Sequence, residues 1–347
     1  MALITALVLV AALLLGGGTR QGFIGDVWVQ SLAIPLLLAS LWVAFTAERP
    51  LSRDLRVPLF VLGLFILAAL AQVLPLPPDV VGALIPIDRS SAVAPALLML
   101  AQVPDAAWAA LLSTLPAIAL FLAVAYLPAA PRRGLAALVV AVGGVSVVLG
   151  LVQMAQGPNS PLRLFDVTNA SVAVGFFANR NHFAALLYTS LLLAAPFLIV
   201  GARRLLTEGP NGVVLLQFVG LCGLIGALFL GIARARSRAG VVLAMVAVFV
   251  IAGLSVLSLG HAGDGQERRA WWSSRRVVLG VLAFALVSAA QGGLAGILTR
   301  FERDPMEDLR VSLTSTTLEA AWSNLPFGAG LGAFVPVFQM FEGGGAL

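Results

Sequence analysis

The sequence has no lysine, a single cysteine and two histidines, and only 11% of its 347 residues are charged. The lone Cys222 excludes an internal disulfide and a cysteine-based metal site, and its apolar neighbours indicate a small packing residue. The sequence also has no Walker A motif, no HExxH motif and no serine-nucleophile elbow. We therefore expect neither a bound metal nor a cofactor.

Long apolar runs recur along the whole chain, and 60% of the residues are hydrophobic. A soluble core could not bury so much hydrocarbon surface, whereas a transmembrane helix needs about 20 mainly apolar residues. We predict an all-α, polytopic transmembrane helix bundle of about nine spans, with external loops that bear short helices. The predicted spans lie near 2–16, 30–46, 57–74, 107–127, 135–155, 181–200, 212–232, 239–259 and 277–299.

We divide the chain into N-terminal transmembrane helices over 1–130 and a second transmembrane region over 131–347 that ends in a partial external loop. No cationic residue precedes the first apolar run, which favours a short membrane helix over a cleaved signal peptide. A proline-rich external loop is predicted near 75–106, with a short interfacial helix around Pro95 to Gln102. Glycines spaced along two spans predict close helix packing; they are Gly220, Gly223, Gly226 and Gly231, then Gly292 and Gly296.

All 21 basic residues are arginines, and the formal net charge is +5. The arginines lie between apolar spans, where topology and anionic head groups explain them, so we predict membrane lipids and not nucleic acid as partners. With a cytoplasmic N-terminus, eleven arginines fall in inside loops and ten in outside segments. Several of the outside ones lie in distinctive motifs, which can indicate function. In this topology His182 and His261 lie on opposite sides, which excludes a metal site that uses both.

Two motifs on the predicted external side concentrate polar groups. In GFFANRNHFA, residues 175–184, amides, a guanidinium and an imidazole crowd a helix N-terminus, where free backbone N–H groups favour an anion. Helix capping with interfacial snorkelling explains the same residues. In RARSRAG, residues 234–240, a continuing helix would place Arg234 and Arg238 on one face. Arginines without a nearby carboxylate favour phosphate, although anchoring to lipid head groups remains the alternative.

Two later motifs are also external in this topology. Residues 300–310 mix arginines with carboxylates and predict a salt-bridged helix start, in which Arg310 lies nearest the following helix. The segment NLPFGAGLGAF, residues 324–334, superficially matches a dinucleotide fingerprint, but it follows no strand and opens no βαβ unit. We predict a tight turn whose backbone approaches a ligand or a helix.

Together these motifs resemble the O-antigen ligase and polymerase family over roughly residues 130 to 340. The resemblance rests on GFFANRNHFA, on SRAG after the next span, on an external Arg310 and on PFGAGLGAF. It implies a GT-C type glycosyltransferase, multi-pass in the bacterial inner membrane, that takes a glycan from undecaprenyl pyrophosphate. The acceptor, on the periplasmic side, would be lipid A core, a polysaccharide or a protein. Transfer in this family inverts the anomeric centre and uses no metal.

The same resemblance implies that Arg238 and Arg310 bind the carrier pyrophosphate, with Arg180, Asn181 and Arg234 as further members of the site. Fixed guanidinium groups would stabilise the negative charge that develops on a diphosphate leaving group. The family also carries a histidine in an H-N-D-like segment shortly after the glycine turn, thought to act on the acceptor hydroxyl. No histidine follows the turn before Leu347, so no catalytic residue is assigned and the chain is expected to be part of a longer protein.

Two other functions fit parts of the sequence. A transporter for a small solute or anion would explain arginines near the membrane, although no carboxylate lies in the middle of a predicted span. A non-catalytic scaffold in envelope assembly would explain the missing histidine.

We expect residues 1–347 alone to lack transfer activity, because the acceptor-activating histidine is missing. A transfer assay with the purified chain and a lipid-linked glycan checks this expectation, and any turnover would contradict it.

Overall fold

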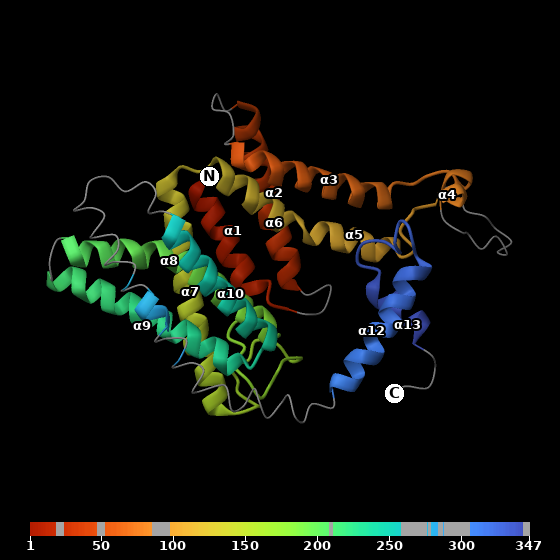
Figure 1. Ribbon diagram of the computed structural model, residues 1–347. Helices are drawn as coiled ribbons and strands as arrows, with labels where there is room; N and C mark the ends of the chain where they lie inside the picture. Colours follow the sequence, from red (N-terminus) through yellow and green to blue (C-terminus); the bar gives the residue numbers. More distant parts are fainter. Residues whose placement is uncertain are drawn as a thin grey trace. The chain divides into compact units, whose positions relative to one another are not determined.

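The computed structural model describes residues 1–18, 24–46, 53–84, 98–207, 211–257, 276, 279–283, 287 and 306–342. Within these ranges the regular structure is helical, apart from one isolated antiparallel bridge between Leu76 and Leu98. The predicted all-α class is confirmed for this part of the chain (Figure 1).

The described residues form six helical stretches that are long and apolar enough to cross a bilayer. These are α2 (Ile24–Thr46), η1 (Arg53–Leu55) with α3 (Arg56–Val73), α5 (Pro104–Ser113) with α6 (Leu115–Tyr126), α7 (Ala129–Gln156), α8 (Arg180–Thr207) and α9 (Gly212–Ala235). Shorter apolar stretches lie in α1 (Ala2–Leu15) and α10 (Arg238–Leu257). Eight predicted spans coincide with these helices. The ninth, near 277–299, falls mostly outside the described residues, so the number nine stays a prediction.

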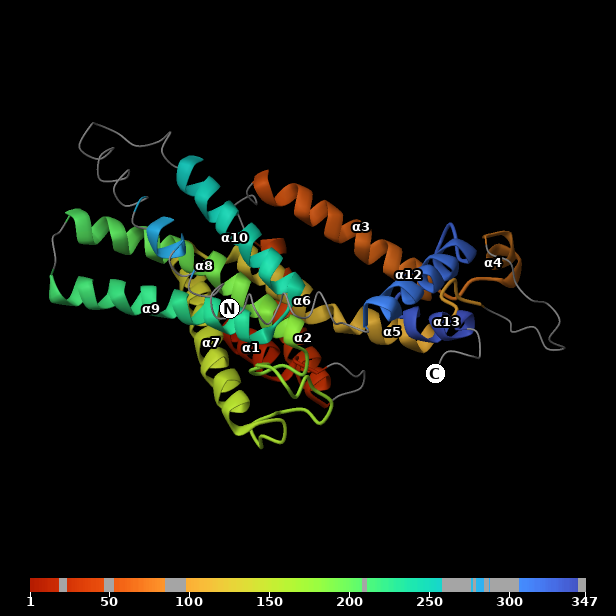
Figure 2. The ribbon, with the colours of Figure 1, turned by 60° about the horizontal axis from the view of Figure 1, so that its bottom comes forward.

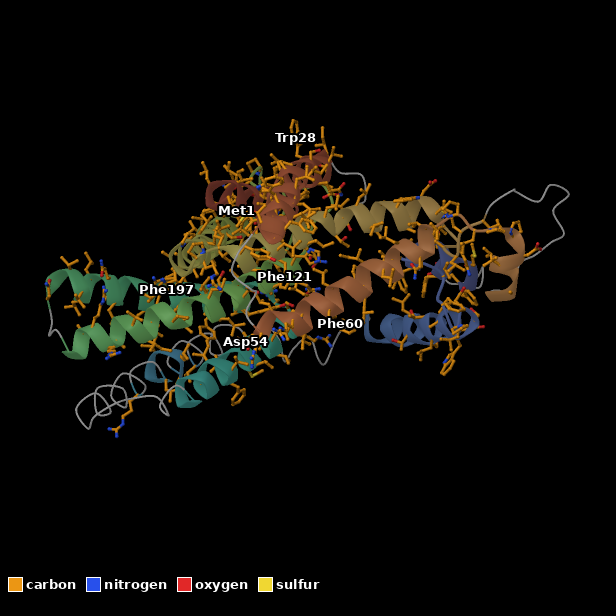
Figure 3. All side chains as sticks on the ribbon, turned by 90° about the horizontal axis from the view of Figure 1, so that it is seen from above. Met1, Trp28, Asp54, Phe60, Phe121 and Phe197 are labelled. Atoms are coloured by element: carbon orange, nitrogen blue, oxygen red, sulfur yellow. The ribbon has the colours of Figure 1, made fainter. Side chains whose placement is uncertain are left out.

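Many large apolar side chains point away from the protein. Phe45 is 87% exposed, Phe249 75% and Leu216 74%, and Figure 3 shows Trp28 projecting outward from α2. Soluble proteins rarely expose so many large apolar side chains to this extent. These faces therefore indicate contact with lipid, as expected of a polytopic helical membrane protein.

By their internal contacts the residues form two compact units, which are described separately below. The first comprises residues 1–8, 26–126 and 304–347, and the second comprises residues 9–25 and 127–303. The boundary at residue 127 lies close to the one drawn from the sequence at 130. The segment 304–347, however, groups with the N-terminal helices.

In the second unit, α7, α9 and α10 pack around α8, whose Phe183 and Leu187 are fully buried. Figures 1 and 2 both show α8 and α9 side by side as an antiparallel pair. A Cβ on Gly231 would lie 2.7 Å from side-chain atoms of Leu187 and of Val147, so close packing is confirmed there. A Cβ built on Gly220, Gly223 or Gly226 would meet no described atom outside its own helix backbone within 4 Å, so close packing at these three glycines stays a prediction. Gly292 and Gly296 lie outside the described residues.

In the first unit, α3 and α5 pack together, as do α12 (Met306–Ser323) and α13 (Phe334–Phe341). A short helix, α4 (Pro78–Leu84), follows α3. The predicted helix around residues 95–102 is wrong over its described part, 98–102. The backbone of Leu98 forms two hydrogen bonds with Leu76, of 2.7 and 2.8 Å, and the Ala101 N–H donates to Gln72 at 3.0 Å. These bonds to α3 and the residues after it hold the segment in a non-helical conformation.

The glycine turn between α12 and α13 packs closely against residues 98–110. Gly330 and Gly332 have φ angles of 111° and 74°, which favour glycine. A Cβ on Gly330 would lie 2.9 Å from Ala101, and one on Gly332 would lie 2.5 Å from the Ala106 carbonyl oxygen in α5. The prediction of a turn whose backbone approaches a helix is therefore confirmed.

Side-chain amides complete this contact, and the sequence alone did not indicate them. The Gln72 side-chain oxygen accepts from the Leu331 N–H at 2.8 Å. The backbone N–H of Gln102 donates to the Ala329 carbonyl at 2.9 Å. The side-chain nitrogen of Gln102 also donates to the Asn324 side-chain oxygen.

Gly332→Ala is expected to destabilise the first unit by about 2–4 kcal/mol, because the methyl group meets the Ala106 carbonyl and the φ angle is unfavourable. Gly328→Ala is a matched control, because Gly328 has the same φ of 74° and no described atom within 4 Å. The control should cost about 1 kcal/mol from φ alone. Thermal unfolding in detergent micelles checks the difference, and equal losses for the two variants would contradict the close contact.

Candidate functional site

The two motifs singled out in the second unit meet in the structure. The Ser237 hydroxyl, between α9 and α10, donates to the side-chain oxygen of Asn181 in the first turn of α8 at 2.7 Å. A Cβ on Gly240 would lie 2.6 Å from the Ala184 Cβ, so the two helix starts are in close contact. Segments 56 residues apart in sequence therefore form one site at this end of the bundle.

The chain turns sharply between α9 and α10 at Arg236, which has φ 50° and ψ 37°. The Arg236 N–H closes α9 on the Ala233 carbonyl at 3.2 Å, and the Ser237 hydroxyl accepts from the Gly240 N–H at 3.0 Å as the cap of α10. A continuing helix through this segment is therefore excluded. Arg234 lies in the last turn of α9, whereas Arg238 is the first residue of α10.

The N-terminus of α8 is capped by asparagines. The Arg180 N–H donates to the Asn169 side-chain oxygen at 2.9 Å, and the Asn181 N–H donates to Asn179 at 2.8 Å. The capping interpretation of this motif is confirmed. Because these two amides are already bonded, an anion at this site would depend on side chains rather than on the first N–H groups of α8.

The loop from 157 to 179 is fixed by Gln153, which is fully buried in α7. Its side-chain nitrogen donates to the carbonyls of Gly175 and Leu162, both at 2.9 Å, and its oxygen accepts from the Gly175 N–H at 3.1 Å. Gly175 has φ 56°, and a Cβ there would lie 2.1 Å from the Ser146 hydroxyl oxygen. This contact places the segment leading into α8 directly against α7.

Arg163 stabilises the same loop through hydrogen bonds to its backbone. Its guanidinium donates to the carbonyls of Asn169 and Val172, each at 3.4 Å, and to that of Ala170. Its Nε is buried and has no hydrogen-bond partner among the described residues, and burial lowers the pKa of the guanidinium. The sequence had placed Arg163 only among the outside arginines. Its position shortly after Pro158 and Pro161 gave no signal of this role.

Four of the five site residues predicted from the sequence lie in this region. Arg180, Arg234 and Arg238 are half-buried and Asn181 is exposed. The first turns of α8 and α10 contain no acidic residue, so the helix dipoles add to the positive potential of the arginines. Asp166 is the one acidic residue in the sequence of the loop from 157 to 179.

The fifth residue, Arg310, belongs to α12 in the first unit, and its side chain lies outside the described residues. Its proximity to Arg238 therefore stays a prediction. Residues 300–305 of the predicted salt-bridged helix start lie outside the described residues. For residues 306–310 only the helical backbone is described, so the salt bridges stay a prediction.

No family model, no curated protein and no solved structure matches the chain.

Gln153→Met is expected to cost about 2–4 kcal/mol, because it leaves buried carbonyl and N–H groups of the loop without partners. The loop should loosen and become accessible to trypsin at Arg163. Gln217→Met is the control, because Gln217 is exposed near the start of α9 and makes no hydrogen bond with this loop among the described contacts. Thermal unfolding and limited proteolysis of the two variants check this prediction, and unchanged protection of the loop in Gln153→Met would contradict it.

Proposed function

We propose that this chain is a membrane glycosyltransferase of the O-antigen ligase type, and that it binds the pyrophosphate of a polyprenyl-linked glycan where α8 meets the α9–α10 junction. The observation that supports this most is the hydrogen bond between Ser237 and Asn181. It gathers arginines from two distant segments into one place.

The composition of this site suits a diphosphate. Arg180, Arg234, Arg236 and Arg238 are all half-buried, so solvent screens their charge less than on an open surface. Guanidinium groups form charge-assisted, two-pronged hydrogen bonds with phosphate oxygens. Placed around a leaving diphosphate, they would stabilise the charge that develops as the glycosidic bond to phosphate breaks.

The position of the site at helix ends suits a lipid-borne donor. The motifs lie where α8 and α10 begin and where α9 ends, while the long apolar helices extend from them. A polyprenyl chain would lie along the apolar helix faces, with its pyrophosphate at the arginines. In the proposed topology this end is periplasmic in a bacterial inner membrane.

Arg238→Gln is expected to weaken binding of undecaprenyl pyrophosphate roughly tenfold to hundredfold, as the loss of a charge-assisted hydrogen bond implies. The purified chain in lipid nanodiscs, titrated with undecaprenyl pyrophosphate, gives the affinity.

Arg56→Gln is the matched control, because it removes an exposed arginine of the first unit at the start of α3. Equal affinities for the wild type and Arg238→Gln would contradict the proposal. Solute flux into liposomes that is indifferent to the carrier lipid would favour a transporter instead.

A further inference from the structure

A second basic site lies at the other end of the same helices. A cavity of about 740 Å³ opens between the start of α7, the end of α8 and the start of α9. The motifs described above lie at the end of α7, the start of α8 and the end of α9. The cavity and the motif site therefore lie at opposite ends of the bundle in the second unit.

Three arginines line this cavity: Arg132 and Arg133 of α7, and Arg204 of α8. All three are exposed, and no carboxylate is among the lining residues that the structure describes. From the sequence these were paired arginines of inside loops without a distinctive motif. The fold brings Arg204 of the second pair to the same cavity as Arg132 and Arg133.

The positions of Arg132 and Arg133 at the start of α7 are electrostatically unfavourable unless an anion binds there. Arg132 and Arg133 lie within the first five residues of α7, whose first turn has no acidic residue. Cations near a helix N-terminus are repelled by the helix dipole, and the two arginines also repel each other. An anion bound between them and Arg204 would relieve both repulsions.

The rest of the cavity is apolar. Apart from the arginines and Gln217, every lining residue is aliphatic, aromatic, proline or glycine. Figure 3 labels one of these residues, Phe197 on α8. Along α8 the lining runs from Leu192 to Arg204. Arg204 lies 12 positions after Leu192, which corresponds to roughly 18 Å of helix, close to the hydrocarbon thickness of one leaflet, roughly 15 Å.

We propose that this cavity holds an anionic phospholipid from the surrounding leaflet, with its phosphate at Arg132, Arg133 and Arg204 and its acyl chains along α8 and α9. A soluble phosphate would satisfy the arginines but would leave the apolar part of the cavity unused. A zwitterionic phospholipid would fill the apolar part but would bring its own cation to the arginines. Basic pockets between helices at a membrane surface suit anionic head groups. This proposal does not depend on the glycosyltransferase proposal.

The test compares phosphatidylglycerol with phosphatidylcholine on the purified whole chain, with bound lipids counted by native mass spectrometry. The wild type should bind phosphatidylglycerol more tightly. The double variant Arg132→Gln/Arg133→Gln should lose about thirtyfold in phosphatidylglycerol affinity, as expected for two arginines near the surface. The matched control Arg53→Gln/Arg56→Gln removes two exposed arginines of the first unit and should leave that affinity unchanged. Equal losses in both double variants would overturn the proposal.

A second variant separates a lipid from a soluble anion. Val200 lines the cavity and is 52% exposed, so Val200→Trp fills the apolar part without disturbing a packed core. Val200→Trp should reduce phosphatidylglycerol binding at least tenfold, whereas Val200→Leu should not. Saturable binding of inorganic phosphate by the wild type, together with unchanged lipid binding by Val200→Trp, would show a soluble-anion site and overturn the proposal.

Glu208 follows Arg204 closely in sequence and lies outside the described residues. Glu208→Gln should maintain or raise the preference for phosphatidylglycerol. A loss of preference in this variant would also contradict the proposal.

Discussion

The side-chain amide of Gln153 pairs with both backbone groups of Gly175, and the geometry of the motif site depends on this pairing. Polar backbone groups that are buried beside apolar helices must find partners within the protein. A long loop at such a place is therefore costly unless an internal group satisfies it. Gln153 and Arg163 provide those partners from the inside, so the loop brings Asn179 and Arg180 to a defined position at the start of α8.

A second set of hydrogen bonds fixes the start of α10 against the start of α8. Ser237 caps α10 and at the same time donates to Asn181, so one hydroxyl group joins two helix starts. The left-handed conformation of Arg236 allows α9 and α10 to follow each other with only two residues between them. The backbone positions of the arginines at this site are thus fixed by turns and helix caps.

The sequence predicted the features that depend on composition and short spacing. Apolar runs located eight helices, and the glycines after Asn324 predicted a tight turn against another element. It could not identify what that turn contacts, because Gln72 and Gln102 lie more than 200 residues away and carry no distinctive pattern. Glycine spacing along α9 was likewise insufficient. Gly231 faces Val147 and Leu187, but Gly220, Gly223 and Gly226 face no described atom outside their own helix backbone, and only the rotation of the helix decides between these outcomes. The sequence also did not predict the basic cavity, because Arg132 and Arg204 line one cavity only when α7 packs on α8.

The length of α8 has a consequence for the membrane in which this protein resides. Arg180 and Arg204 are 24 residues apart on one helix, which corresponds to roughly 36 Å along its axis. A hydrocarbon layer of roughly 30 Å would leave both guanidinium groups among the lipid head groups with little tilt. A much thinner bilayer would force the helix to lean or would draw one end out into water. Hydrophobic matching through this helix thus favours membranes of ordinary or greater thickness.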